Sequence, residues 1–426
     1  MSAFDKVIGY QSIKEELLQI CDLIRNPDAY RQLGAEIPHG VILYGAPGMG
    51  KSLMAECLIE QCGLPVNRIR KDTGAKSFVK RIQDSFQSAK EQRPSIILLD
   101  DMDKFANEDE RHSDAEEYVA IQAGIDAVKG SGVLVIATVN NMRKLPHSLI
   151  RSGRFDRKIR LETPGEKDSA DIILHYLDQR AIDPALDQED LTHMLNYSTC
   201  AELETIVNEA AVYAGYARKS QIEMEDLLKA VLRMQYDAPD SLTETSVHQN
   251  RMIALHEAGH LVISEVLMPG SIGLASLRAS GRNSPNGFVR RCKEYSCPED
   301  YVLMLLGGKA AAELYGRGTY ASGCESDIRR ASEQIRDLIS ESGAAGFGMV
   351  DVANQQFPET SESMNARNEA VVHAELNRSL GRARAILIEN RTFLESTAQL
   401  LLEKETLLYS DIRKLRETCY PSKQIG

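Results

Sequence analysis

One eight-residue segment, Gly45-Ala-Pro-Gly-Met-Gly-Lys51-Ser52, restricts the fold of this chain more than any other feature of its sequence. It follows a short apolar run at residues 41–44 and precedes a segment with apolar residues at helical spacing. A glycine-rich loop between a strand and a helix lets backbone N–H groups surround phosphate oxygens, and the helix N-terminus adds positive potential. The segment therefore predicts an α/β domain that binds ATP, with Lys51 at the β- and γ-phosphates and Ser52 on Mg²⁺.

Two further apolar runs, at residues 96–99 and 132–137, predict buried parallel strands joined by crossover helices. The run at 96–99 ends in two carboxylates. We expect Asp100 beside Mg²⁺ and Asp101 as the acid that activates the attacking water. Asn140 follows the next strand, where its amide can orient that water or contact the γ-phosphate, although a turn-forming asparagine is the alternative. The residues predicted to contact ATP and Mg²⁺ are Gly45, Ala46, Pro47, Gly48, Met49, Gly50, Lys51, Ser52, Leu53 and Asp100.

Three arginines lie within seven residues after these strands, at positions 151, 154 and 157. The planar guanidinium group is suited to the charge that develops on a γ-phosphate in the transition state. Arg151 and Arg154 are therefore candidate catalytic residues. A solvated basic loop is the alternative interpretation.

A second motif, His256-Glu257-Ala-Gly-His260, lies inside an apolar segment of helical periodicity. Residues four apart share a helix face, so His256 and His260 can bind one zinc ion, and Glu257 can act as the general base on water. Two surface histidines on a helix would be the alternative, but the apolar surroundings argue against it. A catalytic zinc needs a third protein ligand. Spacing alone leaves several candidates for it, which include Glu313, Glu325 and Asp327.

The composition excludes several classes of protein. The formal net charge is −12, so the chain lacks the dense basic face that non-specific nucleic-acid binding requires. None of the eight cysteines forms a C-x-x-C pair, and the first residues do not form a secretory signal. We therefore expect reduced thiols in a cytoplasmic protein. No stretch approaches the roughly 20 apolar residues that span a bilayer. We therefore expect a soluble chain with no transmembrane segment.

The order of segments predicts a multidomain chain. Residues 1–164 form the α/β nucleotide-binding domain, and residues 165–235 form a helical lid. A polar segment with a proline at 236–250 is the predicted linker, and residues 251–426 form a mostly helical domain that carries the zinc motif. An interruption rich in Gly, Ser, Arg and Asn at 279–287 predicts a hairpin or loop.

These motifs, in this order, resemble those of the FtsH-type AAA+ zinc metalloproteases, and the resemblance covers nearly the whole chain. The matching segments include Phe4-Asp-Lys-Val-Ile-Gly9, Leu33-Gly-Ala-Glu-Ile-Pro38, Val207-Asn-Glu-Ala-Ala211, His256–His260, Leu306-Gly-Gly308 and Ser322-Gly-Cys-Glu-Ser-Asp327. The resemblance implies that the fold is an AAA+ α/β core with a helical lid, followed by a helical metallopeptidase domain.

The resemblance also implies roles that spacing leaves open. It implies Asp327 as the third zinc ligand and Asn140 as the sensor residue. It makes Arg151 and Arg154 arginine fingers that reach the ATP of a neighbouring subunit. The resemblance also implies that Ile8, Gly9 and His175 line the adenosine pocket. It implies a homohexameric ring that pulls polypeptide through a central pore into an enclosed chamber.

The chain departs from the family pattern in three places. The family begins with transmembrane helices, so this chain is either a soluble relative or lacks an anchor that was removed. Asp101 stands where the family has glutamate, and its reach is shorter by roughly 1.5 Å, which predicts slower ATP hydrolysis. The family's pore loop carries an aromatic–hydrophobic pair followed by glycines. The candidate pair here is Phe78-Val79, with a packed core phenylalanine as the alternative.

The sequence therefore predicts an ATP-dependent zinc endopeptidase that unfolds, translocates and degrades unfolded or damaged proteins. Two alternatives stay open. One is a remodelling machine or chaperone whose zinc site is only structural. The other is an ATP-gated peptidase with little unfolding power, in which nucleotide assembles the ring and only unstructured chains are cut.

Overall fold

The computed structural model describes residues 2–34, 38–71, 75–106, 115–151, 153–178, 180–238, 247–278, 287–316, 324–342 and 362–420. The chain divides into two compact units. The first consists of Met1–Gln179 and Tyr197–Thr205, and the second consists of Arg180–Asn196 and Ile206–Gly426. The domain boundaries predicted at residues 164, 235 and 250 remain predictions. The two compact units group residues that pack together, and they do not test where one domain ends and the next begins.

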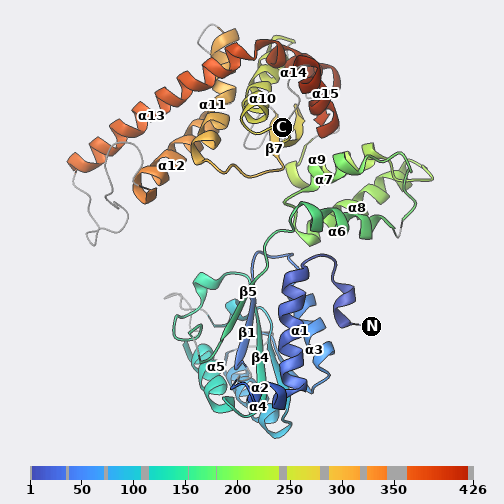
Figure 1. Cartoon of the computed structure of the whole chain (residues 1–426), viewed down its shortest axis with the longest axis vertical. Coiled ribbons are helices and arrows are strands. Elements are labelled where there is room, and N and C mark those ends of the chain that lie inside the picture. Colours follow the sequence, from blue (N-terminus) through green and yellow to red (C-terminus); the bar gives the residue numbers. More distant parts are fainter. Residues whose placement is uncertain are drawn as a thin grey trace. The chain divides into compact units, whose positions relative to one another are not determined.

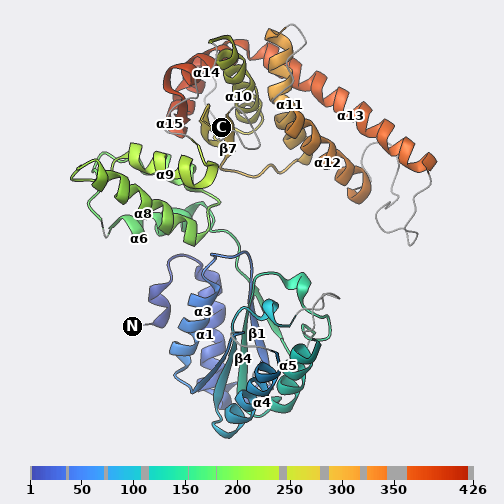
Figure 2. The ribbon, with the colours of Figure 1, turned by 180° about the vertical axis from the view of Figure 1, so that it is seen from behind.

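The first unit is built on a five-stranded parallel sheet with the strand order β2-β3-β4-β1-β5. Its strands are β1 (Gly40–Tyr44), β2 (Val66–Ile69), β3 (Ser95–Leu99), β4 (Val133–Val139) and β5 (Arg157–Arg160). Its helices are η1 (Ala3–Lys6), α1 (Gln11–Arg25), α2 (Pro27–Arg31), α3 (Lys51–Cys62), α4 (Ala75–Glu91), η2 (Met102–Lys104), α5 (Ala115–Val128), η3 (Met142–Lys144) and α6 (Glu166–Asp178). Helices α1 and α3 cover one face of the sheet and α4 and α5 the other (Figures 1 and 2). The predicted α/β class is confirmed.

Strands β3 and β4 are buried along their whole length, as continuous apolar runs in a parallel sheet require. One correction concerns the predicted pore-loop residue Phe78, which has 0% of its surface exposed. It belongs to α4 and packs edge-on against Phe105, with ring centroids 5.2 Å apart. Phe78, Ile82 and Phe86 recur at every fourth residue, so they form the apolar face of α4. Phe78 is thus a core residue, and the prediction that it grips substrate is wrong.

The second unit is mostly helical and contains a three-stranded antiparallel sheet with the order β7-β6-β8. Its strands are β6 (Ile272–Ser276), β7 (Phe288–Arg291) and β8 (Thr406–Leu408). Its helices are α7 (Gln188–Leu195), the part of α8 (Cys200–Tyr216) from Ile206 onward, α9 (Met224–Tyr236), α10 (Val247–Leu267), α11 (Pro298–Tyr315), α12 (Glu325–Ser342), α13 (Glu362–Glu389), α14 (Arg391–Lys404) and α15 (Tyr409–Cys419). The hairpin predicted at 279–287 agrees with the antiparallel pairing of β6 and β7, although residues 279–286 lie outside the described part.

Helices α10 and α11 approach each other through glycines. A Cβ on Gly259 would lie 2.3 Å from the carbonyl oxygen of Gly307, and a Cβ on Gly307 would lie 2.6 Å from the carbonyl oxygen of Gly259. Only residues without a Cβ allow this distance between backbones. The close approach fixes α10, which carries the histidine motif, against α11 in the core of the second unit.

Candidate nucleotide and metal sites

The phosphate-binding loop joins the end of β1 to the start of α3, as its sequence predicts. Gly48 and Gly50 both have a φ of 81°, in the left-handed region that glycine adopts without strain. Lys51 is the first residue of α3, and its Nζ donates to the carbonyl oxygens of Gly45 at 2.9 Å and Ala46 at 2.7 Å. Burial lowers the pKa of Lys51, while nearby aspartates oppose that shift. The lysine is thus held at the loop.

Three polar groups from separate segments meet at the predicted Mg²⁺ side of this loop. The Oδ1 atom of Asp100 accepts hydrogen bonds from Ser52 Oγ at 3.1 Å and from Thr138 Oγ1 at 2.7 Å. Thr138 Oγ1 in turn accepts the backbone N–H of Asp101 at 2.8 Å. Because β3 and β4 are parallel neighbours, their carboxyl ends bring these groups to one edge of the sheet.

Both oxygens of the Asp101 carboxylate have partners. Its Oδ1 accepts a hydrogen bond from Asn140 Nδ2 at 3.1 Å, and its Oδ2 lies 2.7 Å from Lys104 Nζ. Arg70 at the end of β2 adds a cation 3.8 Å from the same Oδ2. Burial alone would raise the pKa of Asp101, but Lys104, Asn140 and Arg70 together lower it. Asp101 also has a φ of 54°, an uncommon backbone conformation for a residue other than glycine.

The two predicted arginine fingers differ in their surroundings. Arg154 is only 4% exposed, and its guanidinium donates to both oxygens of Asp126, at 2.9 and 2.7 Å. It also donates to the carbonyl oxygen of Ser148. Arg151 is exposed. Arg154 is therefore engaged within its own chain, and a role for either arginine at a neighbouring ATP stays a prediction.

The residues predicted around the adenosine lie at two places in the first unit. Gly9 has a φ of +70°, and a Cβ there would lie 2.8 Å from Cγ of Asp168 near the start of α6. The next residue, Tyr10, donates its backbone N–H to Asp168 at 3.2 Å. These contacts hold Gly9 and Tyr10, which directly follow Ile8, against α6. His175 lies two turns further along α6 and is exposed.

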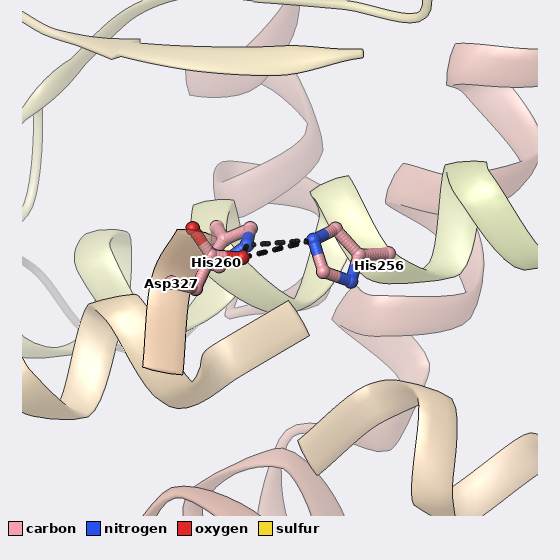
Figure 3. A group of neighbouring side chains, drawn as sticks. All are labelled: His256, His260 and Asp327. Atoms are coloured by element: carbon pink, nitrogen blue, oxygen red, sulfur yellow. Dashed lines mark hydrogen bonds and ion pairs between the residues drawn. The ribbon is translucent and has the colours of Figure 1, made fainter. Parts of the chain in front are cut away.

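The metal-binding motif forms as predicted, and three ligand atoms converge in the second unit. Nε2 of His256 lies 3.0 Å from Nε2 of His260, and Asp327 Oδ2 lies 3.3 Å from each of them. Figure 3 shows the three side chains pointing toward one another, with both imidazoles on α10 and the carboxylate on the first turn of α12. Two imidazoles and one carboxylate are the donor set of a catalytic zinc site, and among the described residues this is the one such cluster.

Neighbouring groups orient the two imidazoles. His260 Nδ1 lies 2.7 Å from the carbonyl oxygen of Met304 on α11, which requires a proton on Nδ1 and leaves the lone pair of Nε2 available to a metal ion. Cys324 Sγ lies 3.8 Å from Nδ1 of His256. A Cβ on Gly308 would lie 2.4 Å from Cε1 of His256 and 2.5 Å from Nε2 of His260. The lack of a side chain at Gly308 therefore makes room for the imidazoles.

Glu257 lies beside this cluster and is only 4% exposed. Burial raises its pKa to about 8, with His260 opposing and Asp327 reinforcing the shift. The other candidates for the third ligand are placed elsewhere. Glu313 pairs with Lys309 at 2.8 Å and with Arg384, and Glu325 is exposed.

Two family models match the chain. The model of the ATPase family associated with various cellular activities (AAA) matches residues 41–163, and that of peptidase family M41 matches residues 243–415. The chain is 31% identical to ATP-dependent zinc metalloprotease FtsH 3 of Symbiobacterium thermophilum, over 99% of this chain and 72% of that relative. It is 30% identical to FtsH 2 of the same organism over 97% and 74%, and 28% identical to FtsH 3 of Petrotoga mobilis over 97% and 69%. The chain belongs to the FtsH-type AAA+ zinc metalloprotease family.

In this FtsH-type chain, sequence reasoning missed two residues of the nucleotide site. Thr138 hydrogen-bonds to both the carboxylate of Asp100 and the backbone N–H of Asp101. The sequence feature that could have identified it is a hydroxyl residue within an otherwise apolar buried strand. Asp103 accepts the backbone N–H groups of Asn140 at 3.1 Å and Asn141 at 3.3 Å, so it holds the loop after β4. The sequence feature that could have identified Asp103 is a third carboxylate two residues after Asp101.

Among the helices that the structure describes, none combines the length and the apolar character needed to cross a bilayer.

Proposed function

We propose that this chain is an ATP-dependent zinc endopeptidase that degrades unfolded or damaged proteins within a homohexameric ring. The observation that carries the proposal is the convergence of His256, His260 and Asp327 within 3.3 Å, next to the buried carboxyl group of Glu257. Family membership and the phosphate-binding loop support a dependence on ATP. We include Mg²⁺ because Ser52 and Asp100 are oxygen donors 3.1 Å apart at that loop.

The peptidase chemistry is assigned to four side chains. His256, His260 and Asp327 would hold Zn²⁺, which supplies Lewis acidity that acidifies water and polarises a peptide carbonyl. The Glu257 side chain, in its ionised form, would accept the proton of the attacking water. The same carboxyl group can then give that proton to the leaving amine.

The motor chemistry is assigned to the edge of the parallel sheet. Lys51 and the glycine-loop N–H groups would bind the phosphates. The carboxylate of Asp101 would orient the attacking water, with Asn140 donating to its Oδ1 and Lys104 donating to its Oδ2. Arg151 is the more accessible candidate for an arginine finger, since Arg154 is buried against Asp126.

The test is casein digestion by the purified full chain with ATP, Mg²⁺ and Zn²⁺. We expect cleavage that stops with a zinc chelator and in the Glu257→Gln variant, which keeps the shape of the side chain but cannot act as a base. ATP hydrolysis should continue in Glu257→Gln. Absence of casein cleavage by the wild-type chain would reject the peptidase and favour a remodelling machine.

A second candidate is an ATP-gated peptidase with weak unfolding power. It is favoured by the burial of Phe78, because the segment between Ile69 of β2 and Ala75 of α4 then contains only Arg-Lys-Asp-Thr-Gly. Such a segment offers no aromatic or aliphatic side chain to grip a polypeptide. Equal cleavage of casein with ATP and with a non-hydrolysable analogue, and no cleavage of a tightly folded protein, would favour this candidate over the first.

A further inference from the structure

Two guanidinium groups of the second unit converge on one tyrosine ring. Tyr301 lies in the first turn of α11. Cζ of Arg291, the last residue of β7, lies 4.4 Å from the centroid of the Tyr301 ring, and Cζ of Arg330 on α12 lies 6.0 Å from it. Arg330 Nη2 also donates to the Tyr301 hydroxyl at 2.5 Å. Because an aromatic ring attracts cations, Tyr301 holds the two arginines beside each other.

These two arginines differ from other arginines of the same unit in their charge balance. Arg336 pairs with Glu369 at 2.9 Å, and Arg416 pairs with Glu265 at 2.7 Å. Within the described ranges, no carboxylate forms an ion pair with Arg291 or Arg330. Arg291 is half-buried and Arg330 is exposed. Two like charges beside one ring repel each other, so an anion that contacts both would stabilise the arrangement.

The helices that carry Tyr301 and Arg330 also border the metal cluster. Tyr301 and Gly308 are seven residues, about two turns, apart on α11, so they share a helix face. Gly308 is the glycine that lies against the two imidazoles. Arg330 follows Asp327 by three residues, which places both on the same side of α12. The tyrosine and the exposed arginine therefore lie on the helix faces that bear the metal site.

Strand β7 brings Arg291 to the same side. Phe288 stacks on Tyr236 of α9, with ring centroids 3.6 Å apart. Because side chains alternate along a strand, Gly287 and Arg291 lie on the opposite face from Phe288. A Cβ on Gly287 would lie 2.8 Å from Cγ of Glu257. One face of β7 thus leads from the candidate base to Arg291, over roughly 13 Å of strand.

We propose that Arg291 and Arg330 form a subsite that binds a carboxylate group of the peptide substrate. This carboxylate belongs either to an acidic side chain or to the C-terminus of the peptide, and a planar guanidinium can donate to both of its oxygens. Tyr301 lies about 10 Å along α11 from Gly308. An extended peptide spans roughly 3.3–3.6 Å per residue, so the bound carboxylate lies about three residues from the scissile bond. The inference rests on the proposed function, for which it names a class of substrate.

The test begins with binding of short fluorescent peptides to the full chain that carries Glu257→Gln, so that bound peptide is not cut. Two amidated peptides differ only in one central residue, which is Glu in the first and Gln in the second. A third peptide has Gln and a free C-terminal carboxylate. The first and third peptides distinguish the two sources of the carboxylate.

The double variant Arg291→Gln and Arg330→Gln removes both guanidinium groups. Arg329→Gln is the matched control, because Arg329 is an exposed arginine on the same helix. Zinc content and ATP turnover are measured for each chain and should equal those of wild type. Equal values would show that the variants keep both sites intact.

We expect a peptide with a carboxylate to bind at least about threefold more tightly than the amidated Gln peptide, which is the size of effect that partly exposed ion pairs produce. This preference should disappear in the double variant and persist in Arg329→Gln. With Glu257 intact, the double variant should raise KM for the preferred peptide at unchanged kcat, since binding common to ground and transition states is lost.

Equal affinity for the three peptides, or no measurable binding of any of them, would overturn the subsite. A preference that survives in the double variant, or that disappears equally in Arg329→Gln, would also overturn it. So would a loss of the preference together with bound zinc, because the arginines would then be structural. If the preference behaves as expected but wild type cleaves neither casein nor the peptides, the subsite stands and the proposed function fails.

Discussion

The nucleotide site and the metal site of this chain are built in different ways. The nucleotide site gathers polar side chains at the carboxyl ends of parallel strands, where Ser52 is exposed and Asp101 is partly exposed. The metal site places His256 and His260 on α10, which packs backbone to backbone against α11. A hydrogen-bonded cluster at a sheet edge can change partners, whereas ligands fixed by a close-packed core cannot. We therefore expect substitutions to tune the first site and to abolish the second.

The largest effect is expected from Asp327→Asn. The neutral amide replaces the carboxylate that lies 3.3 Å from both imidazoles. Casein cleavage should fall at least about 100-fold, since changes outside the ligand shell alone cost 10–100-fold. ATP turnover should stay near wild type. Glu325→Gln, an exposed change on the same helix, is the matched control. An Asp327→Asn chain that cleaves casein as fast as this control would contradict the assigned ligand set.

A second test adds one methyl group to the metal site. In Gly308→Ala the new Cβ would lie 2.4 Å from the His256 ring, which forces the helix or the imidazole to move. We expect the free energy of unfolding to fall by about 1–3 kcal/mol, with loss of zinc and of casein cleavage. Gly381→Ala is the control, because nothing lies within 4 Å of its Cβ position. It should raise the free energy of unfolding by up to about 1 kcal/mol. Normal zinc content in Gly308→Ala would show that the site is less tightly packed than described.

A smaller effect is expected when the side chain of Asp101 in the nucleotide site is lengthened. Asp101→Glu restores the reach of the carboxylate and should raise ATP turnover, by roughly tenfold at most, because general-base catalysis contributes about 10²–10⁴ in all. The φ of 54° at this position disfavours glutamate, so we expect slightly lower thermal stability at the same time. ATP turnover no faster than that of wild type would remove the shorter side chain as the cause of slow hydrolysis.

The smallest effect is a shift in the pH dependence of ATP turnover. Lys104 lies 2.7 Å from Asp101 Oδ2 and contributes to the lowered pKa of that carboxyl group. Because a carboxylate with a lowered pKa stays ionised to lower pH, removing the cation should raise the pH at which activity is lost on acidification. Lys104→Met should therefore move the acid limb to higher pH, while Lys144→Met, an exposed control, should not. Unchanged acid limbs in both variants would mean that Asp101 is not the titrating base.

The sequence alone identifies the residues of these two sites that lie in contiguous motifs, but not those that are distant in the chain. Contiguous motifs locate Lys51, Ser52, His256 and His260, because strand–loop–helix geometry and the helical repeat are local properties. Asp327, the proposed third zinc ligand, lies 67 residues after His260, and spacing alone leaves Glu313, Glu325 and Asp327 open. Only the tertiary packing of α12 on α11, which itself packs on α10, brings Asp327 to the imidazoles.

Two of the errors of sequence reasoning have a clear physical explanation. The prediction that Phe78 grips substrate is wrong because α4 already begins at Ala75, so Phe78 is a helix residue. It lies on the same apolar helix face as Ile82, and this face points into the core. Thr138 is missed because its role depends on the parallel register of β3 and β4, which aligns Leu99 with Ala137.

The central claim is that His256, His260 and Asp327 together hold one zinc ion. The most direct measurement is the zinc content per chain of purified, dialysed wild type, Asp327→Asn and Glu325→Gln. We predict close to one equivalent in wild type and Glu325→Gln and far less in Asp327→Asn. A wild-type chain without bound zinc, or an Asp327→Asn chain that retains it, would contradict the claim.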